Sequence, residues 1–271
     1  RYLCVASFLF ATPLLHTASH GRVWDLMHVQ GNLFITLCLL SLVRRWWWLA
    51  GLCFGVAAMC RHGLVFCIVA LPLFTLLADE PEALKKQLWQ WTKMALGCLL
   101  PVGITLLLHQ AILGSPTATP YQTFWKANGE LPSHTFHLRY FWDNASLYFM
   151  TLPEPIARFP YFQFPLTGQS TLLLAPFLGA CFIPLRWRAF PLICFFGSVM
   201  VVITYLLYFY NGVSQFAARY WQDGFPFMVL ACCYTFSYNR LTQGIGIALM
   251  AISAVTIGYS TFVVNFYPVS P

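Results

Sequence analysis

Charge is what this sequence has least of. Asp, Glu, Lys and Arg together make up 8% of its 271 residues, whereas hydrophobic residues make up 59%. A soluble globular domain carries roughly 25% charged residues, so this composition excludes that class of protein. The mean hydropathy of +0.67 indicates instead a protein whose solvent is the lipid bilayer.

The chain also lacks the patterns of three common kinds of site. Its ten cysteines fall within apolar segments and not as pairs in polar loops, which excludes a disulfide framework. No set of Cys and His residues completes a four-ligand zinc pattern, and we predict no metal site. The net charge of +7 is not gathered into a basic cluster with interleaved aromatic residues, so we expect no nucleic-acid partner.

What the sequence does have is long apolar segments. A helix that crosses a membrane needs about 20 apolar residues, and nine segments approach that length. The sequence therefore predicts an all-α fold, a polytopic transmembrane bundle of about nine spans that forms one membrane-embedded domain over residues 1–271, with its termini on opposite sides. The spans lie at about 2–15, 29–43, 46–60, 63–78, 94–114, 169–185, 189–210, 224–238 and 241–262.

Two local features refine this prediction. The chain begins at Arg1 and continues at once with apolar sequence, which predicts a fragment of a longer protein. The apolar run from Trp46 to Ala78 is too long for one membrane helix and short for two, with Arg61 and His62 at its middle. It predicts two short helices that meet at a buried charged turn.

Lysine and arginine predict the orientation. When the spans are numbered in alternation, one side receives basic residues in short loops, and the positive-inside rule makes that side cytoplasmic. These residues are Arg44, Arg45, Lys85, Lys86, Lys93, Arg186, Arg188 and Arg240. The basic residues on the other side need an explanation other than topology, and they are Arg22, Arg61, Lys126, Arg139, Arg158 and Arg219.

Residues 16–30 form a predicted external connection that carries the first external carboxylate, Asp25. Arg22, Asp25 and His28 are spaced three residues apart, so they share one face if this segment is helical. One interpretation is an interfacial ion pair of small energetic weight. The other is a carboxylate beside an arginine that holds a phosphate.

The longest predicted external stretch is 115–168. Its many prolines and aromatic residues make it too apolar for a disordered linker, so we expect it to pack on the membrane surface. Part of it has the spacing of an interfacial amphipathic helix. The apolar face of that helix would hold Phe141, Ala145, Tyr148 and Leu152, with Asp143 and Asn144 opposite.

A third external connection carries Arg219, Tyr220 and Asp223 just before an apolar segment. Charge at the mouth of a membrane bundle is costly and usually serves a partner. Arg219 and Asp223, at positions i and i+4, could instead pair with each other. The two interpretations are compatible.

Together these segments resemble the GT-C superfamily of membrane glycosyltransferases, near the protein O-mannosyltransferases and the aminoarabinose transferases of bacterial lipid A. The resemblance extends over most of residues 6–230 and rests on four stretches in order. They are FATPLLHTASHGRVW, LAGLCFGVAAMCRHGLVF, FPLTGQSTLLLAPFL and FAARYWQDGFPFMVL. The resemblance implies short helix pairs, an external interfacial helix and a late arginine around a cavity that holds a polyprenyl-phosphate sugar.

The chemistry implied by this resemblance is an inverting transfer of the sugar to an acceptor lipid, glycan or protein outside the cytoplasm. The departing phosphate needs positive charge. In this family the principal catalytic acid lies in the first external loop, which here would precede Arg1. Asp25 would then be a supporting or substitute carboxylate, with His20 as a second candidate for catalysis. The candidates for binding the donor phosphate are Arg22, Arg61, His62, Lys126, Arg219 and Tyr220.

Two other hypotheses stay open. A transporter or flippase would use the external arginines to recruit anionic headgroups of lipid-linked or amphiphilic molecules, although no internal repeat is evident. A non-catalytic membrane scaffold would leave the external charges unused. Short external loops favour a bacterial plasma membrane, with the site on the non-cytoplasmic face.

Overall fold

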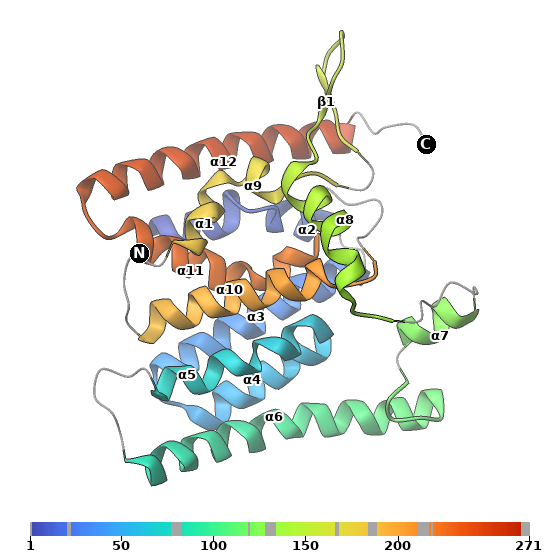
Figure 1. Ribbon diagram of the computed structural model, residues 1–271, viewed down its shortest axis with the longest axis vertical. Helices are drawn as coiled ribbons and strands as arrows, with labels where there is room; N and C mark the ends of the chain where they lie inside the picture. The colour runs from blue at the N-terminus through green and yellow to red at the C-terminus, as the bar shows by residue number, and fades with distance from the viewer. Residues whose placement is uncertain are drawn as a thin grey trace.

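The computed structural model describes residues 2–20, 23–76, 83–118, 120–127, 134–165, 168–183, 189–210, 217 and 219–266. The described regular structure is almost entirely helical, which confirms the predicted all-α class. The helices form a stack that runs from α6 at one edge to α12 at the other, and the hairpin of β1 projects beyond the stack (Figure 1).

The described elements follow one another as short and long helices with one small hairpin. The α-helices are α1 (Tyr2–Phe10), α2 (Leu14–His20), α3 (Val23–Val43), α4 (Trp47–Cys60), α5 (Ala70–Leu76), α6 (Leu84–Leu113), α7 (Pro120–Ala127), α8 (Phe141–Ala145), α9 (Thr171–Leu174), α10 (Ala189–Leu206), α11 (Phe225–Phe236) and α12 (Arg240–Phe266). The 3₁₀ segments are η1 (His62–Val69), η2 (Leu138–Tyr140), η4 (Pro176–Phe182) and η5 (Arg219–Gly224), and η3 (Ser146–Met150) is a π-helix. Strands β1 (Glu154–Pro155) and β2 (Phe162–Gln163) pair antiparallel.

Three described helices are long and apolar enough to cross a membrane. They are Asp25–Val43 within α3, α6 and α12. The shorter apolar helices Trp47–Cys60, His62–Leu73 and Phe190–Leu206 fall short of a bilayer; the first, at 14 residues, spans about 21 Å, against about 30 Å for the hydrocarbon core. The structure therefore supports a membrane protein, and the count of nine crossings stays a prediction.

Small residues bring α4 and α6 into close contact. A Cβ atom on Gly51 would overlap the main-chain carbonyl of Met94, and one on Gly97 would overlap the carbonyl of Trp48. Membrane helices associate through such small residues because lipid offers no hydrophobic drive to bring them together. The outer face of α6 stays exposed, with Leu99, Leu107 and Ile112 in position to contact lipid.

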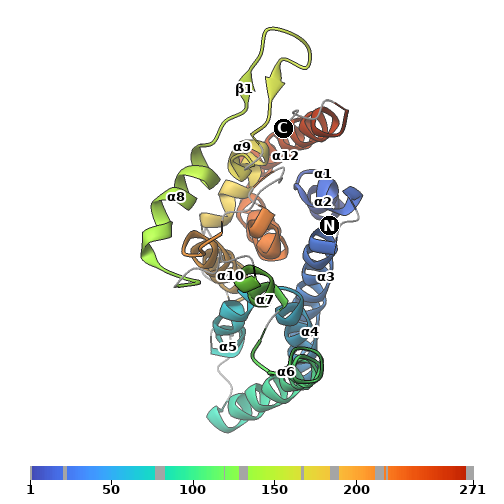
Figure 2. The same ribbon diagram turned by 90° about the vertical axis from the view of Figure 1, so that its right-hand side faces the viewer.

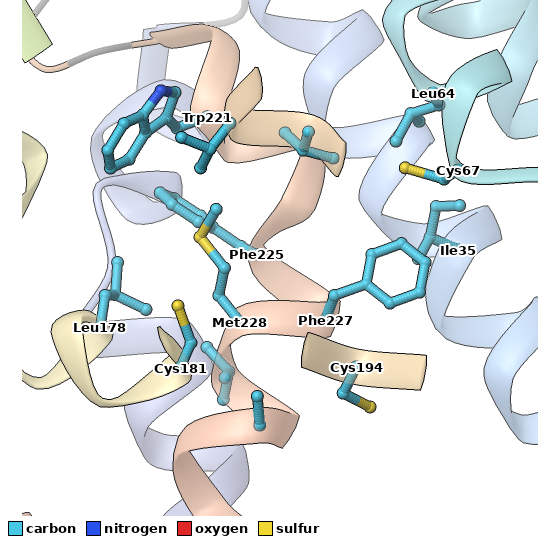
Figure 3. Packing of buried hydrophobic residues seen from close by; sticks show 14 of the residues in the cluster. Ile35, Leu64, Cys67, Leu178, Cys181, Cys194, Trp221, Phe225, Phe227 and Met228 are labelled. Atoms are coloured by element: carbon cyan, nitrogen blue, oxygen red, sulfur yellow. The ribbon is translucent and has the colours of Figure 1, made fainter. Parts of the chain in front are cut away.

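The interior is built around α11. Phe225, Phe227 and Met228 of this helix are 0–1% exposed, and Figure 3 shows Phe227 reaching toward Ile35 while Trp221 lies above Phe225. An added Cβ on Gly197 of α10 would lie 2.6 Å from the ring of Phe227, so this glycine makes room for the ring. This packing holds the start of α11 in place, at the point where η5 joins it.

The predicted connection at 16–30 is helical over most of its length. α2 ends at His20 and α3 begins at Val23, so the second apolar segment starts earlier than the predicted residue 29. Its polar residues Asp25 and His28 are buried, at 8% and 0% exposure. A span predicted from hydropathy stops where polar residues begin. Here the helix continues through these polar residues, because they face the protein interior and contact other segments of the chain.

The predicted helix is present, and Phe141, Ala145 and Tyr148 of its predicted apolar face pack into or against the core. It runs through α8 and η3 and ends at Met150, so Leu152 lies beyond it and is 59% exposed. Asn144, expected on the polar face, is 3% exposed. Its Nδ2 donates to the carbonyls of Tyr205, Leu206 and Tyr208 at 3.2, 3.1 and 2.8 Å. The amide is buried because it satisfies carbonyl groups that the end of α10 leaves unpaired.

Candidate functional site

Asp223, which is fully buried in η5, is the centre of a polar cluster. Its Oδ1 lies 2.6 Å from Nδ1 of His28 and 3.2 Å from Nε of Arg61, and its Oδ2 lies 3.0 Å from the same Nε. The hydroxyl of Tyr205 donates a further short hydrogen bond to Oδ2. One carboxylate thus joins four segments of the chain.

The cluster forms because each partner stands at the end of a helix or near it. His28 lies in the second turn of α3, Tyr205 near the end of α10, and Asp223 just before α11. Arg61 stands between α4 and η1 with an extended backbone (φ −140°, ψ 99°). The predicted break in the apolar run at Arg61 is therefore confirmed.

Two glycines leave space for these side chains. A Cβ on Gly31 would lie 3.3 Å from Cγ of Arg61, and one on Gly63 would overlap the hydroxyl group of Tyr205. Gly31 therefore lets the arginine stem cross α3. Gly63 lets η1 approach α10 closely enough for Arg61 and Tyr205 to reach the same carboxylate.

The electrostatics of the cluster keep Asp223 ionised. Burial by itself raises the pKa of this carboxyl, but the charge of Arg61 and the hydrogen bonds from His28 and Tyr205 outweigh burial and lower the pKa to about 2. Asp223 forms two ion-pair contacts, one with His28 and one with Arg61.

Basic side chains gather around one aromatic ring of the cluster. The guanidinium carbon of Arg61 lies 5.3 Å from the ring centroid of Tyr220, and that of Arg219 lies 5.6 Å from it. Tyr205 stacks on Tyr220 with ring centroids 5.0 Å apart and an interplanar angle of 17°. Such cation–π contacts are common for arginine, and here they bring two arginines from distant segments to one place.

Arg61 does not use its whole guanidinium group for the ion pair. Both hydrogen bonds to Asp223 come from Nε, so Nη1 and Nη2 take no part in them. The Arg61 side chain is 18% exposed, whereas that of Asp223 is 0% exposed. The terminal nitrogens of an arginine form a planar fork that suits an oxyanion.

Asp25 lies one turn before His28 on the same buried face of α3, with Cβ atoms of such pairs about 5–6 Å apart. It is 8% exposed. Within the described part of the chain it makes no hydrogen bond and no ion pair. Asp25 is thus a second acidic side chain within one helical turn of His28.

The structure places the other predicted site residues as follows. Arg219 and Tyr220 lie beside Arg61, and their role in binding a phosphate stays a prediction. His62 begins η1 and is exposed, and Lys126 is exposed near the end of α7; among the described residues neither bonds to the Asp223 cluster. His20 is the last residue of α2, and Arg22 lies outside the described residues.

Sequence reasoning missed three members of the cluster. Asp223 was considered as a partner of Arg219, but it pairs with Arg61 instead. His28 was noted only as a neighbour of Asp25, and Tyr205 stands in an apolar helix with no polar signal around it. One signal was available. Arg61 directly follows one predicted span and Asp223 directly precedes another, and the alternation of spans places both residues on the same side of the membrane.

The sequence matches no protein-family model, and comparisons with curated proteins and with solved structures gave no match. The site must therefore be interpreted from its own geometry. Among the described residues, no group of three or more His, Cys, Asp or Glu side chains could hold a metal ion. The functional side chains of the site are arginines, a histidine, tyrosines and carboxylates.

Proposed function

We propose that this chain is a membrane glycosyltransferase that moves a sugar from a polyprenyl-phosphate donor to an acceptor on the non-cytoplasmic face. The observation that carries the proposal is the meeting of Arg61 and Arg219 at the ring of Tyr220. Two guanidinium groups in a largely buried site provide the charge that a lipid-linked phosphate requires.

The distribution of basic residues supports the location. α3 begins at the site and ends at Val43, directly before Arg44 and Arg45. The positive-inside rule places the Arg44 end in the cytoplasm, so the Asp223 cluster lies at the other end. α7, α8 and the hairpin of β1 lie in the right-hand half of the molecule in Figure 1, on the side that faces the viewer in Figure 2, as expected of an external cap. A bacterial plasma membrane would suit these short connections.

Exposed apolar helix faces supply a route for the lipid. The donor's polyprenyl tail would lie among side chains such as those on α6, and the phosphate would stay at the membrane interface beside Arg61 and Arg219. No charged side chain of the cluster would then need to enter the hydrocarbon core, where charge is most costly.

In the proposed reaction the acceptor hydroxyl or amine attacks the anomeric carbon of the sugar. The bond between that carbon and the phosphate oxygen breaks, and the phosphate leaves with the electron pair, stabilised by Arg61 and Arg219. The acceptor loses a proton to a carboxylate. Asp25 is our candidate for this base because it is mostly buried and lies one turn from His28.

One observation favours a transporter or flippase as a second candidate. The helix break at Arg61, with an extended residue followed by eight residues of 3₁₀ helix, resembles the discontinuous helices that line transport sites. A transporter would move the intact lipid, whereas a transferase would release polyprenyl phosphate.

The two candidate functions are distinguished by following both the sugar and the polyprenyl phosphate of the donor. The purified protein in liposomes receives a panel of radiolabelled polyprenyl-phosphate hexoses and a membrane extract as the source of acceptor. We expect release of polyprenyl phosphate, at least about 10²-fold slower in Asp25→Asn, which should still bind donor. Arg219→Gln should weaken donor binding, and exposed Arg139→Gln is the matched control. Movement of intact donor across the bilayer without release of phosphate would establish transport instead.

A further inference from the structure

His28 has one ring nitrogen that the cluster uses and one that it does not. Nδ1 lies 2.6 Å from Oδ1 of Asp223. Nε2 is buried, and within the described part of the chain it has no hydrogen-bond partner. The whole residue is 0% exposed. Buried polar atoms in proteins are nearly always hydrogen-bonded, so this nitrogen needs a partner that the described residues do not supply.

The position of His28 indicates the charge of that partner. The His28 ring centroid lies 6.2 Å from that of Tyr220, the same ring that Arg61 and Arg219 approach. The charged groups that act on His28 are Arg61, Asp223 and Arg219. Three basic side chains thus surround the ring of Tyr220, with Asp223 as the carboxylate among them. This surplus of basic groups indicates that the missing partner of Nε2 is an anion.

The hydrogen bond to Asp223 also fixes where the protons are. Because Nδ1 faces a carboxylate, Nδ1 carries a hydrogen, and the neutral ring then has a lone pair on Nε2. A neutral ring cannot donate from Nε2. Addition of an anion beside Arg61 and Arg219 makes a second proton on the ring favourable, and Nε2 then becomes a donor.

We propose that Nε2 of His28 is the third donor, with Arg61 and Arg219, to a bound phosphate group, and that binding of the phosphate brings one proton onto His28. The proposal deepens the proposed function and rests on it for the lipid that carries the phosphate. The recognition itself requires only a phosphate mono- or diester, lipid-linked or free.

Two substitutions separate a role in ligand binding from a role in structure. The amide nitrogen of asparagine can replace Nδ1 and keep the contact to Asp223, so His28→Asn removes only the nitrogen that faces the ligand. The amide of glutamine reaches the place of Nε2 and gives up the contact to Asp223, so His28→Gln does the reverse. His134→Asn, at an exposed histidine, is the control.

The measurement is the dissociation constant of polyprenyl phosphate for the full chain in nanodiscs between pH 6 and pH 8, with inorganic phosphate as a second probe. We expect wild-type affinity to fall as the pH rises, because Nε2 donates only on a protonated ring. His28→Asn should bind roughly 10- to 100-fold more weakly at pH 6, and its remaining pH dependence should be that of the second ionisation of the phosphate itself, at about pH 6. His28→Gln should keep part of the affinity, show the same remaining pH dependence, and melt at a lower temperature.

Proton uptake gives an answer that does not depend on how the variants fold. Calorimetric titrations of the wild type in two buffers of different ionisation enthalpy should show uptake of about one proton per phosphate bound. Wild-type-like affinity and pH dependence in His28→Asn, or no proton uptake in the wild type, would overturn the proposal. Tight binding of inorganic phosphate would make the free anion the ligand, and a preference for polyprenyl phosphate would make it the lipid.

Failure of this inference and failure of the proposed function have different signatures. If the protein releases polyprenyl phosphate in the transfer assay while His28→Asn binds normally, the function stands and the role of His28 is refuted. If phosphate binding depends on His28 but no sugar is transferred, the anion site stands and the glycosyltransferase is refuted.

Discussion

Replacing Asp223 by asparagine should destabilise the protein severely, although the side chain keeps its shape. The carboxylate makes two contacts to Nε of Arg61, at 3.0 and 3.2 Å, and accepts from His28 and Tyr205. Asparagine leaves Arg61 without its counter-charge and keeps one oxygen as acceptor. Breaking a buried ion pair from one side costs about 3–5 kcal/mol, which corresponds to a drop of roughly 6–20 °C in melting temperature for a chain of this size.

The protein's own cysteines provide the assay. None of the nine cysteines whose side chains the structure describes forms a disulfide, and Cys38, Cys67 and Cys194 are among those that are buried, so a thiol-reactive dye reports unfolding in detergent. Replacing both charges, with Arg61→Met and Asp223→Leu, should recover part of the lost stability, because apolar replacement of a whole buried pair is often neutral or stabilising. The same double variant should not bind polyprenyl phosphate. The reasoning is refuted if Asp223→Asn melts within about 2 °C of the wild type.

Two further measurements test the surroundings of the site. Asn144→Leu should lower the free energy of unfolding by about 1–3 kcal/mol, because three carbonyls at the end of α10 lose their donor, and a melting temperature equal to that of the exposed-site control Asp143→Leu would contradict this. The contribution of Asp223 to stability should also depend on pH. The folded-state pKa of this carboxyl, about 2, lies below its ordinary value, so the ionised form stabilises the fold by about 2 kcal/mol. This stabilisation is present above pH 4 and is lost as the pH falls toward 2. Melting curves followed by circular dichroism from pH 7 down to pH 3 should show the loss in the wild type and a weaker dependence in Asp223→Asn, since thiol labelling requires the thiolate and fails at low pH.

The sequence predicted those features that depend on local pattern. Apolar length predicted α6 and α12, and a charged pair within an apolar run predicted the break at Arg61. The residues Arg219 and Tyr220 were selected because basic and aromatic side chains preceded an apolar segment. In each case the signal lies within a few residues of the feature that it predicts, so a single sequence is sufficient to find it.

The partners of these residues could not be predicted in the same way. Asp223 is separated by 195 residues from His28 and by 162 from Arg61, and a local pattern cannot show that such residues meet. The error at Asn144 has the same cause, because its partners are carbonyls of α10 about 60 residues away. A polar residue next to apolar sequence is assigned to water when its internal partner is unknown.

The break at Arg61 links the fold to the site in a way that helix pattern alone does not show. Had α4 continued through residue 61, a helical backbone there would tilt the arginine stem toward the N-terminus of α4. With the extended conformation the stem instead lies against Gly31 of α3. Gly63, two residues later, permits contact with Tyr205. The same interruption therefore positions the cation and admits the tyrosine that bonds its counter-ion. A substitution that merely restores helical geometry at residue 61 should thus remove the cluster while leaving the apolar core around α11 in place.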